Sequence, residues 1–217
     1  MRINKWVVGL IVLLCILVTG QAFGAENKGQ VLMLLRGGMG SDTSPAVADY
    51  AIIKEFGVMK TTLEGAGYTV VLATLDGKPV HGKALSITPD LKFSDVKMAD
   101  YKALLLPCLD AADTPPESLQ IAKEALAQGK PIAAQNGGVF VLSMAGILKG
   151  KNFAIAEYYA VGDGKQYFDP NGGKYVGDGV VQDGTILTSG VCPIMSQFTK
   201  KPDGTLELTQ KLIAMMK

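Results

Sequence analysis

Residues 130–150 have the sequence Lys-Pro-Ile-Ala-Ala-Gln-Asn-Gly-Gly-Val-Phe-Val-Leu-Ser-Met-Ala-Gly-Ile-Leu-Lys-Gly. The short apolar run at residues 131–135 predicts a buried strand. Asn136-Gly137-Gly138 predicts a sharp turn, because asparagine and glycine tolerate backbone angles that other residues avoid. The apolar residues 139–148 then predict a helix. A strand that turns directly into a buried helix is a building unit of α/β folds.

Similar units lie on both sides of this stretch. Strands are expected at residues 30–35, 68–74, 103–107 and 185–189, and helices at residues 44–65, 114–128 and 206–216. Residues 153–159 are expected to form a further strand, and residues 162–184 to form hairpin-like segments. Because strands alternate with helices, the sequence predicts an α/β fold in which helices cover both faces of a mainly parallel sheet.

The carboxyl ends of these strands mark the expected functional edge, because open parallel sheets bind ligands there. Residues 36–43, 108–113, 136–138 and 189–192 follow strand ends. Residues 36–41 match neither the dinucleotide fingerprint nor the P-loop, so we expect no phosphate site in that loop.

Composition and charge exclude several classes of protein. The chain has 217 residues, of which 48% are hydrophobic and 19% charged, so it is neither a disordered tail nor a coiled coil. The net charge is +1 and no basic block occurs, which argues against nucleic-acid binding. A single histidine argues against most acid–base and zinc schemes. We therefore expect no metal and no cofactor.

The first 24 residues have the pattern of an export signal. Arg2 and Lys5 precede an uncharged apolar run at residues 6–18, and small residues at Ala22 and Gly24 suit cleavage before residue 25. The run is shorter than the roughly 20 residues of a membrane-spanning helix, so we expect cleavage and no membrane span in the mature chain. The mature protein would be exported, and periplasmic in a Gram-negative bacterium.

Residues 130–150 resemble the nucleophile-elbow segment of the DJ-1/PfpI family. Residues 66–80, 100–107 and 180–189 are similar to other segments of that family in the same order. The resemblance covers essentially residues 30–217. It implies a class I glutamine amidotransferase-like, flavodoxin-like three-layer sandwich, a single domain at residues 25–217 after the signal peptide at residues 1–24, and a homodimer.

The family's catalytic elements are altered in this sequence. The nucleophilic cysteine of the elbow and the histidine after it correspond to Asn136 and Gly137, and the Pro-Gly-Gly loop reads Pro107-Cys108-Leu109. For the family's acidic residue, Asp42 lies in the corresponding loop. A carboxamide cannot replace a thiolate as a nucleophile. The resemblance thus implies a catalytically degenerate protein, a pseudoenzyme.

Two functions remain open. In the first, Asn136, Gly137, Gly138, Cys108 and Leu109 form a vestigial site that binds a small molecule or a protein partner. In the second, the chain is a hydrolase-like or glyoxalase/deglycase-like enzyme that uses Cys108 or an unrecognised set of residues. No histidine occurs in the neighbouring motifs, so a packing role of Cys108 is favoured over a nucleophilic one.

Two other sets of residues need an interpretation. His81 follows the second strand and has no metal-ligating partner at suitable spacing, so it is predicted to be a solvated loop residue. Cys108 and Cys192 remain after removal of the signal, and both are expected at the edge of the sheet that carries Asn136. An exported protein can join two such cysteines in a disulfide. Two separate buried thiols are the favoured interpretation, and the disulfide stays open.

Overall fold

The computed structural model describes residues 27–35, 45–108, 114–162 and 164–217. The predicted signal peptide, Asp42 and Leu109 lie outside the described residues.

A seven-stranded sheet with the order β10-β11-β7-β6-β1-β2-β5 runs through the centre of the fold. Its strands are β1 (Gln30–Leu34), β2 (Thr69–Thr74), β5 (Leu91–Lys92), β6 (Tyr101–Leu106), β7 (Ile132–Gln135), β10 (Val180–Asp183) and β11 (Ile186–Ser189). All neighbours pair in parallel except β10 and β11, which are antiparallel. Two short two-stranded sheets join β3 (Val80–His81) to β4 (Ser86–Ile87) and β8 (Asn152–Phe153) to β9 (Lys174–Tyr175).

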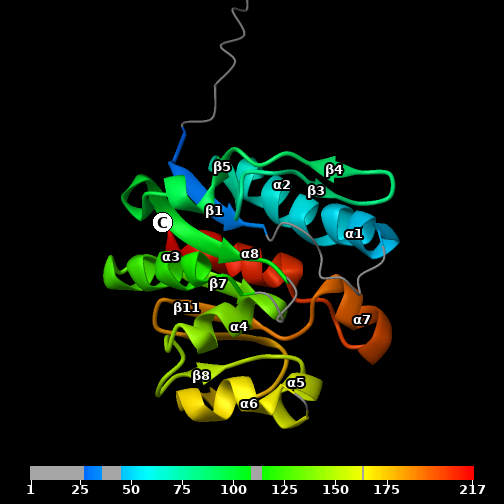
Figure 1. Cartoon of the computed structure of the whole chain (residues 1–217). Coiled ribbons are helices and arrows are strands. Elements are labelled where there is room, and N and C mark those ends of the chain that lie inside the picture. Colours follow the sequence, from blue (N-terminus) through cyan, green and yellow to red (C-terminus); the bar gives the residue numbers. More distant parts are fainter. Residues whose placement is uncertain (1–26, 36–44, 109–113, 163) are drawn as a thin grey trace, which may run out of the picture.

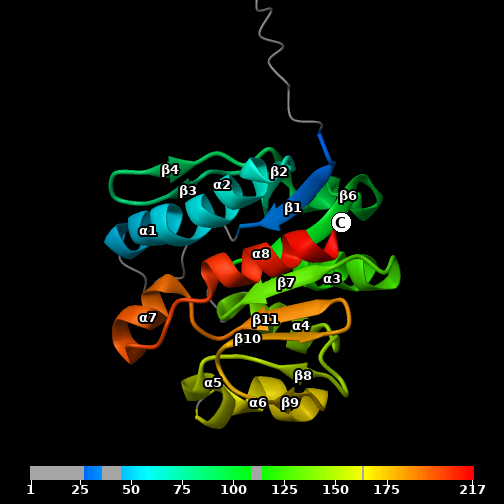
Figure 2. The ribbon, with the colours of Figure 1, turned by 180° about the vertical axis from the view of Figure 1, so that it is seen from behind.

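Helices cover both faces of this sheet (Figures 1 and 2). The longer ones are α1 (Pro45–Ala51), α2 (Gly57–Gly65), α3 (Pro116–Ala127), α4 (Gly137–Met144), α7 (Pro193–Thr199) and α8 (Thr205–Met215). The shorter ones are α5 (Glu157–Val161), α6 (Lys165–Phe168) and the single turns η2 (Phe93–Asp95), η3 (Met98–Asp100) and η5 (Asp169–Asn171). A π-helical turn, η1 (Ile52–Phe56), joins α1 to α2.

Alternate strand residues supply the two halves of the core. Leu32, Leu104 and Ile132 pack with α3 and α4, while Met33 and Leu105 pack with α1, α2 and α8 on the other face. This alternation follows from the period of two in a β-strand. Because both faces are buried, the strands are apolar throughout, as the sequence shows. The predicted fold class is confirmed: the protein is a three-layer α/β sandwich with a mainly parallel sheet.

The segment after β8 differs from the prediction. Residues 153–159 were expected to form one strand, but β8 ends at Phe153 and α5 begins at Glu157. The aromatic residues that favoured a strand are used in packing instead. Phe140 of α4 has its ring 5.2 Å from that of Tyr159 and 5.4 Å from that of Tyr167. Tertiary packing has therefore overridden local β propensity.

None of the described helices combines the length and the apolar composition that crossing a membrane requires.

Candidate functional site

Asn136 occupies a strained turn between β7 and α4. Its backbone angles are φ 41° and ψ −103°, which non-glycine residues seldom adopt. Two backbone hydrogen bonds hold the turn: the Asn136 N–H donates to Ser189 O at 2.6 Å, and the Val139 N–H donates to Asn136 O at 2.9 Å. The predicted strand-to-helix elbow is confirmed at this residue.

Gly138 allows the first turn of α4 to approach the end of β6. A Cβ atom at this position would lie 2.2 Å from Leu106 O and 2.8 Å from Pro107 O, far inside contact distance. The elbow and the loop after β6 can therefore meet only because residue 138 is glycine. Gly137 and Gly138 are both buried, as their predicted place beside the sheet requires.

Glu55 is a site residue that the sequence analysis missed. It lies in η1, where the Gly57 N–H donates to Ile52 O, and its side chain is fully buried. The Cys108 N–H donates to Glu55 Oε1 at 2.6 Å. A signal was present in the sequence, because Glu55 follows Ile52 by three residues on an otherwise apolar helix face. A carboxyl group buried in this way needs a specific partner or function.

Glu55, Cys108, Asn136 and Cys192 meet at the carboxyl edge of the sheet, and we call these four residues the thiol cluster. A carboxylate oxygen of Glu55 and the two cysteine sulfurs all lie within 4.8 Å of one another. The amide Nδ2 of Asn136 donates to Cys108 Sγ at 3.3 Å and to Cys192 Sγ at 3.8 Å. Glu55, Asn136 and Cys192 are buried, whereas Cys108 is half-buried. Cys108 is therefore the most exposed member of the cluster.

Cys192 is positioned by a buried polar network. It precedes α7, and the carbonyl of the adjacent Val191 accepts a hydrogen bond of 2.9 Å from Gln135 Nε2. The other end of that amide, Oε1, accepts one of 3.1 Å from the Thr205 hydroxyl. Gln135 directly precedes Asn136, so the residue that ends β7 fixes both the elbow and the segment that carries the second thiol.

The surroundings of the thiol cluster favour the protonated, uncharged forms of Glu55 and Cys192. Burial raises the pKa of Glu55 well above its usual value, and the neighbouring Cys108 raises it further. The pKa of Cys192 is also raised, first by its hydrogen bond with Cys108 and then by burial. A protonated carboxyl beside two sulfurs can donate a proton or, after losing it, contribute to an anionic set of ligands.

The structure brings together most of the residues singled out in the sequence. Cys108, Asn136 and Cys192 belong to the cluster, with Gly137 and Gly138 directly after Asn136. His81 lies apart in the hairpin of β3 and β4, where its Nδ1 is 3.1 Å from Ser86 Oγ. In this structure Cys108 and Cys192 are not joined in a disulfide. Whether they can form one stays open, and ligand binding stays a prediction.

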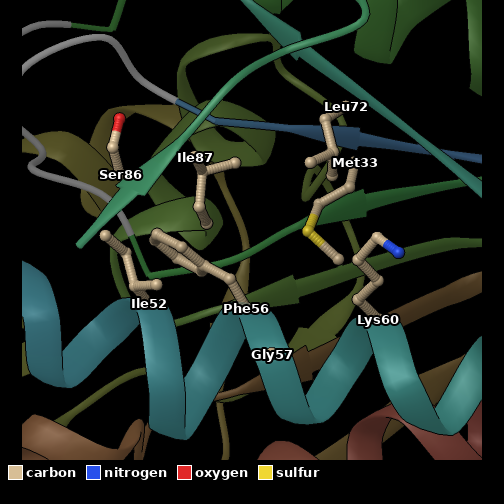
Figure 3. Close-up of a pocket in the computed structure, with 8 residues that line it drawn as sticks. All are labelled: Met33, Ile52, Phe56, Gly57, Lys60, Leu72, Ser86 and Ile87. Atoms are coloured by element: carbon tan, nitrogen blue, oxygen red, sulfur yellow. The ribbon is translucent and has the colours of Figure 1, made fainter. Parts of the chain in front are cut away.

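A separate, largely apolar cavity of about 330 Å³ lies between the α1–α2 helix and the hairpin of β3 and β4 (Figure 3). Its lining consists of Met33, Ile52, Phe56, Gly57, Lys60, Leu72, Ser86 and Ile87. The turn η1 thus lines this cavity with Ile52 and Phe56 and supplies Glu55 to the thiol cluster.

The sequence is similar to those of known proteins and to the sequence model of one family. The sequence model of the DJ-1/PfpI family matches residues 46–202. The deglycase PfpI of Pyrococcus furiosus is 31% identical over 93 residues, which are 41% of this chain and 56% of that protein. An uncharacterized protein of Archaeoglobus fulgidus is 30% identical over 129 residues, 58% of this chain and 73% of that protein.

A solved ThiJ/PfpI domain protein from Brachyspira murdochii superposes with a TM-score of 0.64 at 17% identity, covering 87% of this chain and 96% of that one. At this identity the likeness concerns the fold alone. The family match, in contrast, spans well over half of the sequence and includes β2, β6, the elbow and β11. The chain belongs to the DJ-1/PfpI family.

Proposed function

We propose that this protein binds a small molecule or a protein partner at the thiol cluster and has lost the family's elbow-thiol chemistry. The observation that carries the proposal is the side chain at the elbow. Asn136 has the strained backbone of a strand-to-helix elbow, yet it presents a carboxamide, whose Nδ2 donates to Cys108 Sγ. An amide nitrogen is not a nucleophile because its lone pair is delocalised into the carbonyl.

The two remaining thiols are poorly placed to take over the reaction. A nucleophilic cysteine is activated by a neighbouring base or cation, most often histidine. The chain's one histidine, His81, lies in the hairpin of β3 and β4, and the acid next to Cys108 is the buried Glu55. A carboxyl group is either neutral or negatively charged, so Glu55 cannot supply the positive charge that stabilises a thiolate.

A second function is favoured by one specific contact. The carboxyl of Glu55 lies within 4.8 Å of Cys108 Sγ and accepts a hydrogen bond from the Cys108 N–H. An acid and a thiol at such a distance could serve a hydrolase-like, glyoxalase-like or deglycase-like reaction with Cys108 as nucleophile. The similarity to a protein named deglycase PfpI points in the same direction.

Turnover assays distinguish the two functions. The purified chain is assayed with peptidase, glyoxalase and deglycase substrates beside the variants Asn136→Ala and Cys108→Ser. The binding function predicts the same background rate for all three proteins. Robust turnover that either substitution abolishes would refute it, and loss in Cys108→Ser would establish the second function. Rapid alkylation of Cys108 near neutral pH would give independent support to the enzyme.

Restoring the family's residue pair is a companion experiment. The double substitution Asn136→Cys with Gly137→His places a thiol and an imidazole at the elbow, where Glu55 is already buried nearby. Turnover gained by this variant and absent in the parent chain would support the loss of an ancestral activity.

Export is part of the proposal. The basic, apolar and small-residue pattern of residues 1–24 supports removal of this segment and an extracytoplasmic location. N-terminal sequencing of the protein from its native source tests this, since an intact Met1 would contradict it.

A further inference from the structure

We infer that Glu55, Cys108 and Cys192 bind a Zn²⁺ ion at the thiol cluster. These residues come from three separate parts of the chain: η1, the end of β6 and the start of α7. Their spacing in the sequence gives no metal-binding motif, and the single histidine had argued against a zinc site. In the fold, one potential ligand atom of each lies within 4.8 Å of the others.

The distances suit a tetrahedral ion. Zinc binds thiolate sulfur at about 2.3 Å and carboxylate oxygen at about 2.0–2.2 Å, so neighbouring donors around it are roughly 3.5–3.8 Å apart. The three donor atoms, all within 4.8 Å of one another, are already close to these separations.

Unsatisfied polar atoms provide a second, independent indication. Among the described residues, Glu55 Oε2 and Asn136 Oδ1 are buried without a hydrogen-bond partner, and both side chains are at most 3% exposed. Such atoms are costly in a protein interior and call for an explanation, of which a bound ion is one. A cation bound next to the two sulfurs would give the buried Glu55 carboxyl the partner that its Oε2 lacks.

Asn136 is suited to support the bound form. Its Nδ2 lies 3.3 Å from Cys108 Sγ and 3.8 Å from Cys192 Sγ. N–H groups directed at thiolates stabilise their negative charge and orient them, as outer residues of metal sites commonly do. This gives the elbow carboxamide a function that a cysteine at position 136 would not have.

The donor set selects the metal class. Two thiolates and one carboxylate favour a borderline-soft cation over Mg²⁺ or Ca²⁺, which prefer oxygen ligands. Metal binding would displace the protons of these three acids, and a dication offsets most of the negative charge that results. Three protein ligands leave the fourth tetrahedral position to water or an exogenous molecule.

The inference rests on the proposed binding function and gives it a chemical class: the partner is a zinc ion whose open position could accept a further donor group. The two ideas can fail separately. Turnover that depends on Cys108 would refute the binding function, whether or not the chain binds zinc. A chain that shows neither turnover nor zinc binding would refute the zinc inference alone.

Metal titration of the untagged, reduced, chelator-treated chain tests the site. Co²⁺ is added first, because its thiolate charge-transfer absorption reports sulfur ligation, and Zn²⁺ then displaces it in competition with a chromogenic chelator. We expect one ion per chain. Cys108→Ser, Cys192→Ser and Glu55→Gln should each weaken binding by at least about tenfold. Glu64→Gln, which alters an exposed glutamate of α2, should leave binding unchanged.

If a variant does not fold, the site can still be tested in the unaltered chain by measuring how zinc affects the alkylation of its cysteines. Zinc should slow alkylation of both cysteines, and a chelator should reverse the protection. Failure of the folded, reduced chain to bind zinc stoichiometrically, or affinity unchanged in Cys192→Ser, would overturn the inference.

Discussion

The Nδ2 of Asn136 lies 3.3 Å from Cys108 Sγ, although these residues follow different strands and are 28 positions apart. The contact joins the elbow after β7 to the loop after β6, which are neighbouring parallel strands. It exists because Gly138 lets α4 approach the β6 end closely. The elbow residue itself is therefore an asparagine, and the thiols of this site belong to neighbouring residues that contact its side chain.

The strain at the elbow predicts how residue 136 responds to substitution. Asn136→Gly and Asn136→Ala both remove the carboxamide, but only glycine adopts φ 41° without steric cost. Asn136→Gly should therefore be more stable than Asn136→Ala by about 1–3 kcal/mol in urea unfolding. At Ala145, where φ is −74°, the order should reverse, and Ala145→Gly should lose about 0.5–1 kcal/mol. Equal stabilities of the two Asn136 variants would show that the turn relaxes.

Close packing at the start of α4 gives a second prediction. The added methyl of Gly138→Ala would meet the backbone oxygen of Leu106 at 2.2 Å, so the helix or the strand must shift. We expect a loss of about 1–3 kcal/mol in thermal or urea unfolding. Gly65→Ala is the matched control, because a Cβ there meets no atom within 4 Å. Similar losses in both variants would contradict the steric explanation.

The sequence predicted the scaffold better than the site. Buried strands and the turn at Asn136 follow from local pattern, so β1, β6 and β7 agree with expectation. A helix follows the turn as expected, but α4 ends at Met144 instead of Leu148. Glu55 lies in a π-helical turn and accepts a hydrogen bond from Cys108, 53 positions away. Helical periodicity reveals neither the turn nor the distant partner. The segment around α5 was also mispredicted, because its aromatic residues pack on Phe140 across the fold.

The buried carboxyl of Glu55 predicts a pH dependence of stability. Its pKa in the folded, metal-free protein is raised, so the unfolded chain loses this proton at lower pH than the folded chain does. The stabilising contribution is complete below the usual pKa of glutamate and is lost as the pH rises toward the folded value, at up to about 1.4 kcal/mol per pH unit.

Glu55→Gln isolates this effect, since glutamine can still accept the hydrogen bond of the Cys108 N–H but does not titrate. As the pH rises from mildly acidic to alkaline, the unfolding free energy of the parent should fall relative to that of the variant. The same comparison for Glu64→Gln, at an exposed glutamate, controls for removing one carboxylate elsewhere on the chain. A difference that does not vary with pH would mean that Glu55 titrates normally.

The last prediction concerns the redox state of Cys108 and Cys192, whose sulfurs lie within 4.8 Å of each other. Rotation of the two side chains could bring them to the bonding distance of about 2.05 Å. In the metal-free chain, diamide should then remove two electrons and two protons from the thiols and join them in an intramolecular disulfide. A bridge across so long a loop would stabilise the chain by roughly 4 kcal/mol in the chain-entropy description.

Zinc should prevent this oxidation, because ligated sulfurs are not available to attack one another. Mass spectrometry after alkylation under denaturing conditions, without reductant, counts the remaining thiols. We expect both residues to be blocked from alkylation after oxidation of the metal-free chain and both to be alkylated when zinc was bound beforehand. Cys192→Ser is the control, since it leaves Cys108 without its bridging sulfur. Two fully alkylated cysteines in the oxidised, metal-free chain would show that the elbow holds the sulfurs apart, and the cluster would then be a metal site without a disulfide state.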